Sequence, residues 1–230
     1  MTASGTYAFL PTNGQCVIQA YRRCQIRTPE LRQEHFDAAF MEMNLALVKF
    51  GNLQPNLWEV SLTTLPLVQG TATYTLPANT VMILDAYITT NSGSQQTNRY
   101  LTPFSRTDYA SLANPTSQGA PTQFWFDRVV PPTINFWPVP DGNGPYTLGY
   151  YSVSQMQDSK LPNGSTPDLA YRFLDAFIAE LAYRLACIYA PTLETQRAAA
   201  AQQAWNIAAA QDTEWVGLSI APPLGRYYRV

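Results

Sequence analysis

Apolar side chains near the start of the chain recur at helical spacing. Within residues 14–27 they fall at Val17, Tyr21 and Cys24, a step of four and then of three residues. This spacing places the three side chains on one face of a helix. Asn13 precedes the pattern as a candidate N-cap, because its side chain can accept a hydrogen bond from a free N–H group of the first turn. We therefore predict a short first helix over residues 14–27.

A longer helix is predicted over residues 28–50. Thr28 is its candidate cap, Pro29 suits the first turn, and Gly51 favours an end to the helix. Apolar residues in alternating steps of four and three give this helix one face that should pack against other helices. The residues of that face are Phe36, Phe40, Met43, Leu47 and Phe50.

The period changes to two from about Leu57, and proline, glycine and threonine become frequent until about Tyr151. Alternation bounded by turn residues is typical of short strands in a small sandwich or a curled antiparallel sheet. A polar loop is expected at residues 91–98, and a short helix capped by Ser105 at residues 103–113. The predicted strands are residues 57–64, 66–69, 72–76, 81–90, 122–127, 133–137 and 146–153.

Helical spacing returns after the β region and extends to Pro191. Ser165 or Thr166 is the candidate cap of this third helix, and Pro167 suits its first turn. Residues 192–212 follow directly and are rich in alanine, which favours helix and lets helices approach closely. The two segments predict a tight helical hairpin. The apolar face of the third helix comprises Leu174, Phe177 or Ile178, Leu181, Leu185 and Ile188.

These elements predict an α+β protein. Residues 1–54 and 155–213, from the two ends of the chain, should form a four-helix bundle. Residues 55–154 form an antiparallel β-sandwich-like domain inserted between the second and third helices. Residues 214–230 form an extended C-terminal arm, because they lack helical spacing and contain two adjacent prolines.

The predicted arm is too short to bury its own apolar side chains. It either packs back on its own domain or docks on a neighbouring subunit or another partner, and both readings are open at this point. The apolar side chains concerned are Leu218, Ile220, Leu224, Tyr227 and Tyr228.

Composition favours an obligate assembly. Charged residues make up 13% of the chain, against about 25% in an ordinary globular protein. Of the fourteen basic residues only Lys49 and Lys160 are lysines, while tyrosine and tryptophan are abundant. Protein–protein interfaces share this bias towards Arg, Tyr and Trp.

The net charge of −2 and the lack of a basic run argue against sequence-independent binding of nucleic acid. We expect no membrane span and no export signal.

The residues that usually carry cofactor or metal chemistry are sparse. The chain has one histidine, His35, and three cysteines, so converging zinc or haem ligands are not expected. Cys16 and Cys24 are too far apart on a helix for a bridge, and with Cys187 they are interpreted as reduced, mostly buried thiols of a protein made in a cytoplasm. His35 is interpreted as a partly exposed, hydrogen-bonded side chain. We predict no cofactor and no phosphate-binding or dinucleotide-binding motif.

Two carboxylates remain as catalytic candidates. Asp127 and Asp141 lie near Trp125 and Trp137 in the sequence, the kind of grouping that a glycosidase uses. Both aspartates, however, flank proline or glycine turns, so structural roles are favoured. No catalytic residue is predicted.

The same stretch predicts a β-hairpin, with TQFWFD and TINFWPVP as strands and RVVPP as the reversal. Side chains alternate across a strand, so Phe124 and Phe126 share a face opposite Trp125. In the second strand Phe136 lies opposite Trp137. One set of rings should fill the β-domain core, and the other is available to another protein chain.

Three stretches together carry a family resemblance: LWEVSLTTLPLVQGTATYTLPANTVMILDAYI, SRTDYASLANPTSQGAPTQFWFDRVVPPTINFWPVPDG, and residues 150–152 ahead of the helix pair. The chain resembles the head-to-tail adaptor of short-tailed bacteriophages and is similar to the tail tubular protein A group. PTQFWFDR and FWPVPDG are the most specific parts. The resemblance implies a structural virion protein that forms a ring, commonly dodecameric, beneath the portal.

The resemblance further implies the partners: other copies of the chain, the portal protein, and the next tail component, a nozzle or tail tube protein. Genomic DNA would pass through the ring without specific binding. Residues 217–230 are then expected to contact the portal or a neighbouring subunit. Arg22, Arg23 and Arg27 are candidates for charge pairs between subunits, with a solvated helix face as the equally open alternative. The competing hypotheses are a virion carbohydrate-binding or glycan-degrading protein, and another ring protein such as a tail terminator.

Overall fold

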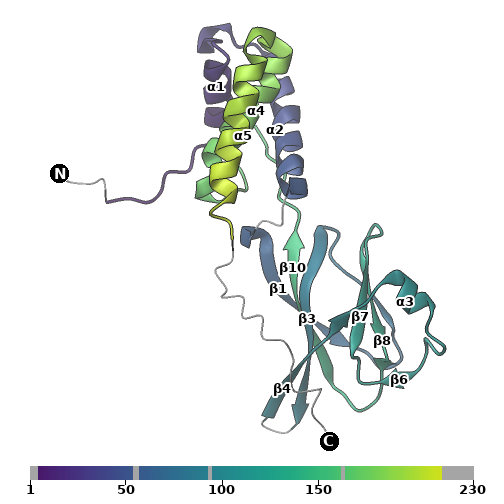
Figure 1. Ribbon diagram of the computed structural model, residues 1–230. Coiled ribbons are helices and arrows are strands. Elements are labelled where there is room, and N and C mark those ends of the chain that lie inside the picture. Colours follow the sequence, from purple (N-terminus) through teal and green to yellow (C-terminus); the bar gives the residue numbers. More distant parts are fainter. Residues whose placement is uncertain (1–4, 54–56, 93–94, 162–163, 214–230) are drawn as a thin grey trace, which may run out of the picture.

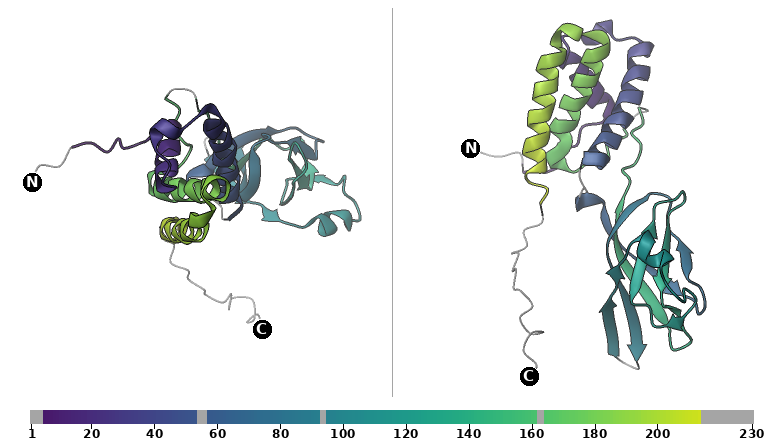
Figure 2. Two further views of the ribbon diagram at one scale, coloured as in Figure 1. Left: turned by 90° about the horizontal axis from the view of Figure 1, so that it is seen from above. Right: turned by 45° about the vertical axis from the view of Figure 1, so that its right-hand side comes forward.

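The computed structural model describes residues 5–53, 57–92, 95–161 and 164–213 and shows an α+β protein (Figure 1). Four main helices pack together at one end of the molecule, and β-sheets form the other end (Figure 2). Two of these helices come from the start of the chain and two from its last third, as predicted. Their bounds are α1 Asn13–Arg23, α2 Gln33–Leu53, α4 Leu174–Tyr189 and α5 Glu194–Ala209.

Helix α1 begins one residue earlier than predicted. Thr12 is the N-cap: its hydroxyl accepts the N–H of Gln15, whose side chain in turn accepts the N–H of Thr12. Asn13 lies inside the first turn and is fully buried. Its amide nitrogen donates to the carbonyl of Lys160 at 2.8 Å, and its backbone N–H donates to Ser165. Asn13, the predicted cap, thus links the start of the chain to its last third through buried hydrogen bonds.

Helix α2 starts later than predicted, at Gln33. The Thr28–Glu30 segment forms a separate 3-10 turn, η1, and His35 then accepts the backbone N–H of Arg32 through Nδ1 at 3.1 Å. The predicted apolar face is only partly right. Phe40 is 41% exposed, because two alanines lie on the buried face and bring α2 close to its neighbours instead. The buried residues of α2 are Ala39, Met43, Ala46, Leu47 and Phe50, and Phe36 is half-buried.

Helix α4 also starts later than its sequence signals suggested. A 3-10 turn, η3 Tyr171–Phe173, leads into it, and residues 165–170 run as a non-helical connection. The Asp168 carboxylate accepts the backbone N–H of Gln157 at 2.9 Å, so it fixes a neighbouring segment and does not cap a helix. On α4 the predicted face is buried, with Phe177 in the core, except for Ile188, which is half exposed near the helix end.

A buried carboxylate links α2 to α4. Glu180 accepts from Lys49 at 2.7 Å and from Arg184 at 2.9 Å. Arg184 also reaches Glu42 on α2 at 3.1 Å. Since Glu180 is almost completely buried, these partners offset the cost of removing its charge from water. The network therefore fixes the two helices in register.

The β part consists of two main sheets and one short pair of strands. The first sheet has the order β1-β10-β3-β4 and is antiparallel throughout; the second has the order β2-β8-β7-β5, with β5 parallel to β7. β6 and β9 form the short pair and are also parallel, so the expectation of a purely antiparallel domain was wrong. The bounds are η2 Leu57–Glu59, β1 Val60–Leu67, β2 Thr73–Thr75, β3 Thr80–Ser92, β4 Gln95–Tyr100, β5 Thr102–Pro103, α3 Arg106–Ala110, β6 Gln118–Gly119, β7 Gln123–Asp127, β8 Thr133–Trp137, β9 Val139–Pro140 and β10 Tyr146–Ser154.

Side chains from both main sheets meet in one core. Ile88, Leu148 and Tyr150 contribute from the first sheet, and Phe124 and Phe136 from the second. This face-to-face packing is the sandwich-like arrangement that the alternating pattern indicated. Helix α3 carries the predicted cap, because the Ser105 hydroxyl accepts the N–H of Asp108.

Two strand assignments need correction. The predicted strands 57–64 and 66–69 form a single strand, β1, preceded by the turn η2. The predicted polar loop 91–98 contains most of β4, which pairs with β3 from Tyr87↔Tyr100 to Ser92↔Gln95. Both strands of this hairpin are polar there, so the apolar alternation that marks a half-buried strand is absent.

The three cysteines are free thiols, as expected, but only two are buried. Cys16 and Cys24 lie in the core of the helical part, whereas Cys187 is exposed on α4. Burial raises the pKa of Cys16 to about 11. It also raises the pKa of Cys24, whose Sγ donates to the carbonyl of Ala182 at 3.2 Å. Both buried thiols are packing residues with little thiolate character.

The burial of these thiols predicts a simple labelling pattern. One of the three cysteines, Cys187, should react with a maleimide in the folded protein, and all three should react in guanidinium chloride. The Cys187→Ser variant should show no reactive thiol until it unfolds. Mass spectrometry of the labelled protein measures this directly. Equal labelling of all three thiols in the native state would contradict the packing of α1 against α4.

Gly149 should resist substitution, because the ring of its cross-strand partner Tyr87 lies over it. A Cβ at Gly149 would lie 2.6 Å from Tyr87 Cε2, far inside contact distance. We expect Gly149→Ala to lower the free energy of unfolding by about 1–3 kcal/mol, the usual cost of overpacking. In a Tyr87→Ala background the same change should be neutral or stabilising, since glycine itself weakens a strand. Urea denaturation of the four proteins tests this; an equal loss in both backgrounds would contradict it.

Candidate functional site

The aromatic hairpin forms as predicted, with Phe124 paired to Phe136 in the β7–β8 register. Phe136 is fully buried, and Phe126 is half-buried against the same core. Trp125 and Trp137 are both half-buried outside it. The Trp125 ring lies 5.3 Å from the ring of Tyr109, and Trp137 Nε1 donates to the carbonyl of Asn114 at 3.1 Å.

The two indoles are thus partly covered by the chain's own α3 segment. A half-buried indole offers less flat surface on which a sugar ring could stack than an exposed one does. The remaining exposed edges of Trp125 and Trp137 are available to another chain, and their use as a contact stays a prediction.

The three predicted arginines lie at or after the end of α1, far from the β part. Arg23 donates to Asp175 of α4 at 2.7 Å, within its own chain. Arg22 and Arg27 are exposed and border a shallow hollow next to η1. The structure therefore gives Arg23 an internal partner, and contacts of the three arginines with another subunit remain predicted.

The C-terminal residues predicted to contact the portal or a neighbouring subunit, Leu218, Ile220, Leu224, Tyr227 and Tyr228, lie outside the described residues. The structure therefore does not test that prediction.

Asp141, one of the two rejected catalytic candidates, has a structural role. Asp141 accepts from the Tyr146 hydroxyl at 2.8 Å and from the backbone N–H of Asn143 at 3.0 Å, and these bonds lower its pKa. It is a turn carboxylate held in its ionised form. The His35 ring stacks on Tyr189 at a centroid distance of 4.7 Å and is half-buried, as expected.

Two further findings concern ligands and membranes. Within the described ranges no three His, Cys, Asp or Glu side chains come together as a metal site would require. None of the helices in the same part of the chain combines the length and apolar character needed to cross a membrane.

Four aromatic rings meet where the helical part adjoins the β part. Trp58, in the turn before β1, lies 4.6 Å from Phe173 in centroid distance. Phe50 of α2 lies 4.6 Å from Trp205 of α5, and Phe173 is 5.5 Å from Trp205. We call these four residues the neck cluster. Sequence reasoning missed it, although a tryptophan within an alanine-rich helix and another at the start of the β region were visible signals.

The side chain of Arg172 lies beside two rings of the neck cluster. The Arg172 guanidinium lies 5.5 Å from the Trp58 ring centroid and 5.6 Å from that of Phe173. It also forms an ion pair with the buried carboxylate of Asp212, just after α5. Arg172 therefore makes cation–π contacts and an ion pair at the same time. Together they hold the end of α5 against the neck cluster.

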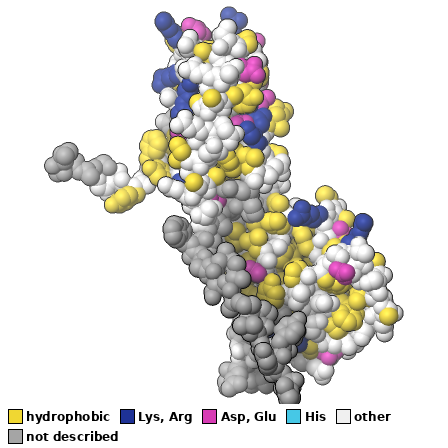
Figure 3. All heavy atoms as spheres, viewed as in Figure 1, with side chains coloured by type: hydrophobic (Ala, Val, Ile, Leu, Met, Phe, Trp, Pro, Cys, Tyr) yellow, Lys and Arg dark blue, Asp and Glu magenta, His cyan; other side chains and the backbone are white. Residues whose placement is uncertain are grey.

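Helix α2 carries a second apolar stripe on its outer face, which sequence reasoning did not single out. Met41, Leu45 and Val48 are 58%, 42% and 52% exposed. Their steps of four and three place them on one side of the helix. Figure 3 shows hydrophobic side chains over the lower half of the helical part and over the β part, while basic side chains lie on the upper helical part and at the upper edge of the β part. A patch of this kind on a small protein marks an interaction site.

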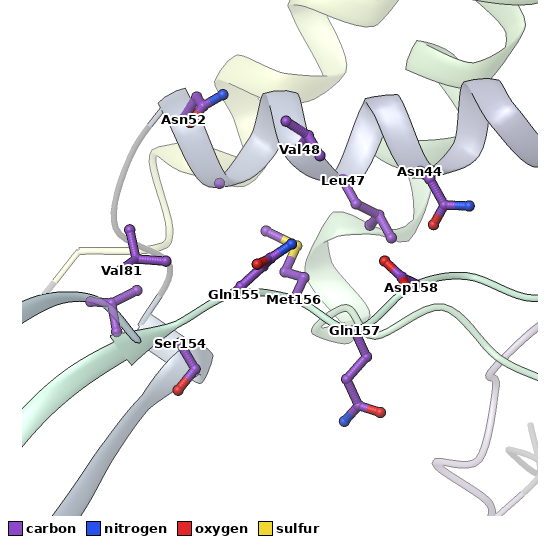
Figure 4. Close-up of a pocket in the computed structure, with 12 residues that line it drawn as sticks. Asn44, Leu47, Val48, Asn52, Val81, Ser154, Gln155, Met156, Gln157 and Asp158 are labelled. Carbon is purple, nitrogen blue, oxygen red and sulfur yellow. The ribbon is translucent and has the colours of Figure 1, made fainter. Parts of the chain in front are cut away.

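A hollow of about 240 Å³ lies beside this stripe, between the lower half of α2 and residues 153–158 (Figure 4). Leu47 and Val48 border it from α2, and Met156 from the connecting segment. Gln155 and Asp158 add polar groups to the lining, and in Figure 4 both side chains point towards α2. The hollow is therefore lined by apolar and polar groups together, as ligand pockets commonly are.

The N-terminal segment is the other exposed apolar feature. Residues 5–11 lie outside the helices and extend away from the helical part beside α1 (Figure 1). Tyr7 is completely exposed, and Phe9 and Leu10 are largely or half exposed. Sequence reasoning placed an arm only at the other end of the chain, although TYAFL before the first helix has the same apolar, non-helical character.

Comparison with known proteins identifies the family. No curated protein matches the chain significantly. The family model described as SU10 adaptor protein matches residues 20–220, which include the end of α1, the three other main helices and every strand of the described structure. This match agrees with the resemblance carried by the hairpin sequence. The chain belongs to the SU10 adaptor protein family and is a phage head-to-tail adaptor protein.

Proposed function

We propose that copies of this chain form a ring that joins the portal to the tail and leaves a central channel for DNA. The observation that carries the proposal is the family match over residues 20–220, which covers the helical part and the β part together. The family implies a structural role in the virion rather than an enzymatic one. Twelve copies is the number implied by the resemblance to tail adaptors.

The distribution of apolar surface supports self-assembly. Tyr7 and Phe9 are exposed beside α1, and Met41, Leu45 and Val48 are exposed on α2. Each subunit thus has apolar groups on more than one side of its helical part, as a subunit with two neighbours in a ring requires. The low content of charged residues has the same explanation, because much of this surface would be buried after assembly.

The charge of the chain supports passage of DNA without binding. A net charge of −2 with no basic run offers few anchors for phosphates, and a subunit that gripped DNA tightly would slow its movement. By the resemblance, the helical part points to the portal and the β part to the next tail component. The lengthwise separation of the two parts in Figure 2 suits a protein that contacts one partner at each end.

Binding to the portal tests the proposed function. Purified chain mixed with portal rings should comigrate with them in size-exclusion chromatography, and electron microscopy should show an added ring. Mass photometry gives the copy number. A chain that stays monomeric, ignores portal and binds glycans would contradict the proposal and support the carbohydrate-binding alternative.

The C-terminal segment is proposed to contribute to this attachment. Deletion of residues 217–230 should leave the urea unfolding midpoint nearly unchanged but reduce comigration with portal by tenfold or more, about 1.4 kcal/mol. A matched control is the Val130→Ala variant, which alters an exposed side chain in the turn between β7 and β8. Equal portal binding by the deletion variant and the full chain would contradict the role of the segment.

A further inference from the structure

We propose that the outer face of α2 in one copy packs along the outer face of α5 in a neighbouring copy. This inference rests on the proposed ring and names a contact between its subunits. Four observations support it. The α2 face is apolar and exposed, and α5 is open along one side. The two faces also match in spacing and lack of charge, and they lie at the same height on different sides of the subunit.

The outer face of α2 is the apolar stripe described above, continued by one asparagine. Its residues follow each other in steps of four, three and four, and all of them are exposed. They are Met41, Leu45, Val48 and Asn52. The buried residues of α2 lie on the opposite side of the helix. An apolar stripe that is turned away from its own core is stabilised by packing against another chain.

Helix α5 packs on α4 along one side and is open along the other. Of its own residues only Ala201 and Ala208 are fully buried, and Trp205 is half-buried in the neck cluster. The open side consists of small and amide side chains, and Ile207 beside it is 62% exposed. We call the residues of this open side the outer face of α5: Ala199, Gln203, Asn206 and Ala210. Much of the helix surface is therefore available to another chain.

The two faces match in spacing and in chemistry. The outer face of α5 also repeats in steps of four, three and four, so the side chains of one helix can enter the gaps between those of the other. Ala199 leaves room for a side chain such as Leu45, and Ile207 adds apolar surface for Val48. Residues 198–211 contain no charged side chain, and neither does the α2 face. Burying one face against the other therefore desolvates no ionised group of either face.

The two faces also lie at the same height in the subunit. The Phe50 ring of α2 is 4.6 Å from the Trp205 ring of α5, and Lys49 borders a hollow together with Gln202. Both helices run towards the β part in Figure 1. The lower half of the α2 face is therefore level with the middle of the α5 face. In the proposed ring the subunits stand side by side between portal and tail, so neighbouring copies meet at equal height.

The two faces point to different sides of the helical part. In the view from above in Figure 2, α4 lies between α5 and the pair formed by α1 and α2. A contact between different surfaces of successive copies is heterologous, and such contacts close into rings when the rotation between copies allows. A second copy is thus the occupant that fits the spacing, the chemistry and the height of the α2 face.

Cross-linking between two variants tests the contact. Val48→Cys and Gln203→Cys are each made in the Cys187→Ser background, so that each protein carries one exposed thiol. The two are mixed with portal rings and treated with a short bis-maleimide. We expect a cross-linked dimer whose peptides join position 48 to position 203. The matched control replaces Gln203→Cys with Gln19→Cys, an exposed glutamine of α1, and should give no such product above the collision background.

A second arm of the experiment uses paired charges. Val48→Glu and Gln203→Arg each place a charge on a face that becomes buried, so each should weaken assembly on portal by about tenfold. The double variant brings opposite charges together on facing surfaces of successive copies and should recover most of this loss. Thermal unfolding of all three variants should match that of the parent chain, since both positions are exposed. Losses that simply add in the double variant would contradict the contact.

The outcomes separate this inference from the proposed function. Rings that form on portal without the 48–203 cross-link, and with both charged variants assembling normally, overturn the packing and leave the adaptor ring intact. A cross-link from position 48 to position 19 shows that α1 covers the α2 face, and this also overturns it. If no ring forms with portal at all, the proposed function fails and the packing fails with it.

Discussion

The packing of Trp58 against Phe173 joins the two parts of this protein. Trp58 lies immediately before β1 and Phe173 immediately before α4, so their contact brings the start of the β part to the start of a bundle helix. Phe50 and Trp205 complete the neck cluster from α2 and α5. Each ring belongs to a different segment, and aromatic pairs of this kind add about 0.5–1.5 kcal/mol each beyond their buried area. These four side chains therefore help to fix the placement of the helices relative to the sheets.

A second set of contacts fixes the return of the chain from β10 to the helices. The Asn44 side chain donates to the carbonyl of Ser159 at 3.2 Å and accepts the N–H of the same residue at 2.9 Å. Asn13 holds the next carbonyl, that of Lys160. Residues 153–158 consequently run beside α2 and form one wall of the hollow in Figure 4. One wall of the hollow beside α2 is thus the segment that connects the β part to the helices.

Periodicity predicted most of the elements but not how they meet. Three helices and most strands follow from steps of three, four and two, because these record local burial, and the fourth helix follows from its alanine content. The cap of α1 and the start of α4 were misplaced because tertiary partners compete for polar groups near helix starts: Asn13 binds Lys160, and Asp168, close to the expected start of the third helix, binds Gln157. β4 was missed because polar strands carry no apolar signal. Periodicity could not predict the neck cluster, since its four rings come from separate segments. The rings of the hairpin were assigned to the correct faces, because alternation depends only on the strand itself.

Helix α2 is apolar on two faces, and this property bears on function. Phe40 was placed in the core and Met41, Leu45 and Val48 were overlooked, because this helix is apolar on two faces. A helix that is apolar around much of its circumference belongs inside a larger structure. In the proposed ring, other copies of this chain of 230 residues with 13% charged side chains would provide that structure. Uncharged contact surfaces provide little electrostatic guidance to the partner. Register between subunits of the proposed ring would then depend on the complementary shapes of their surfaces.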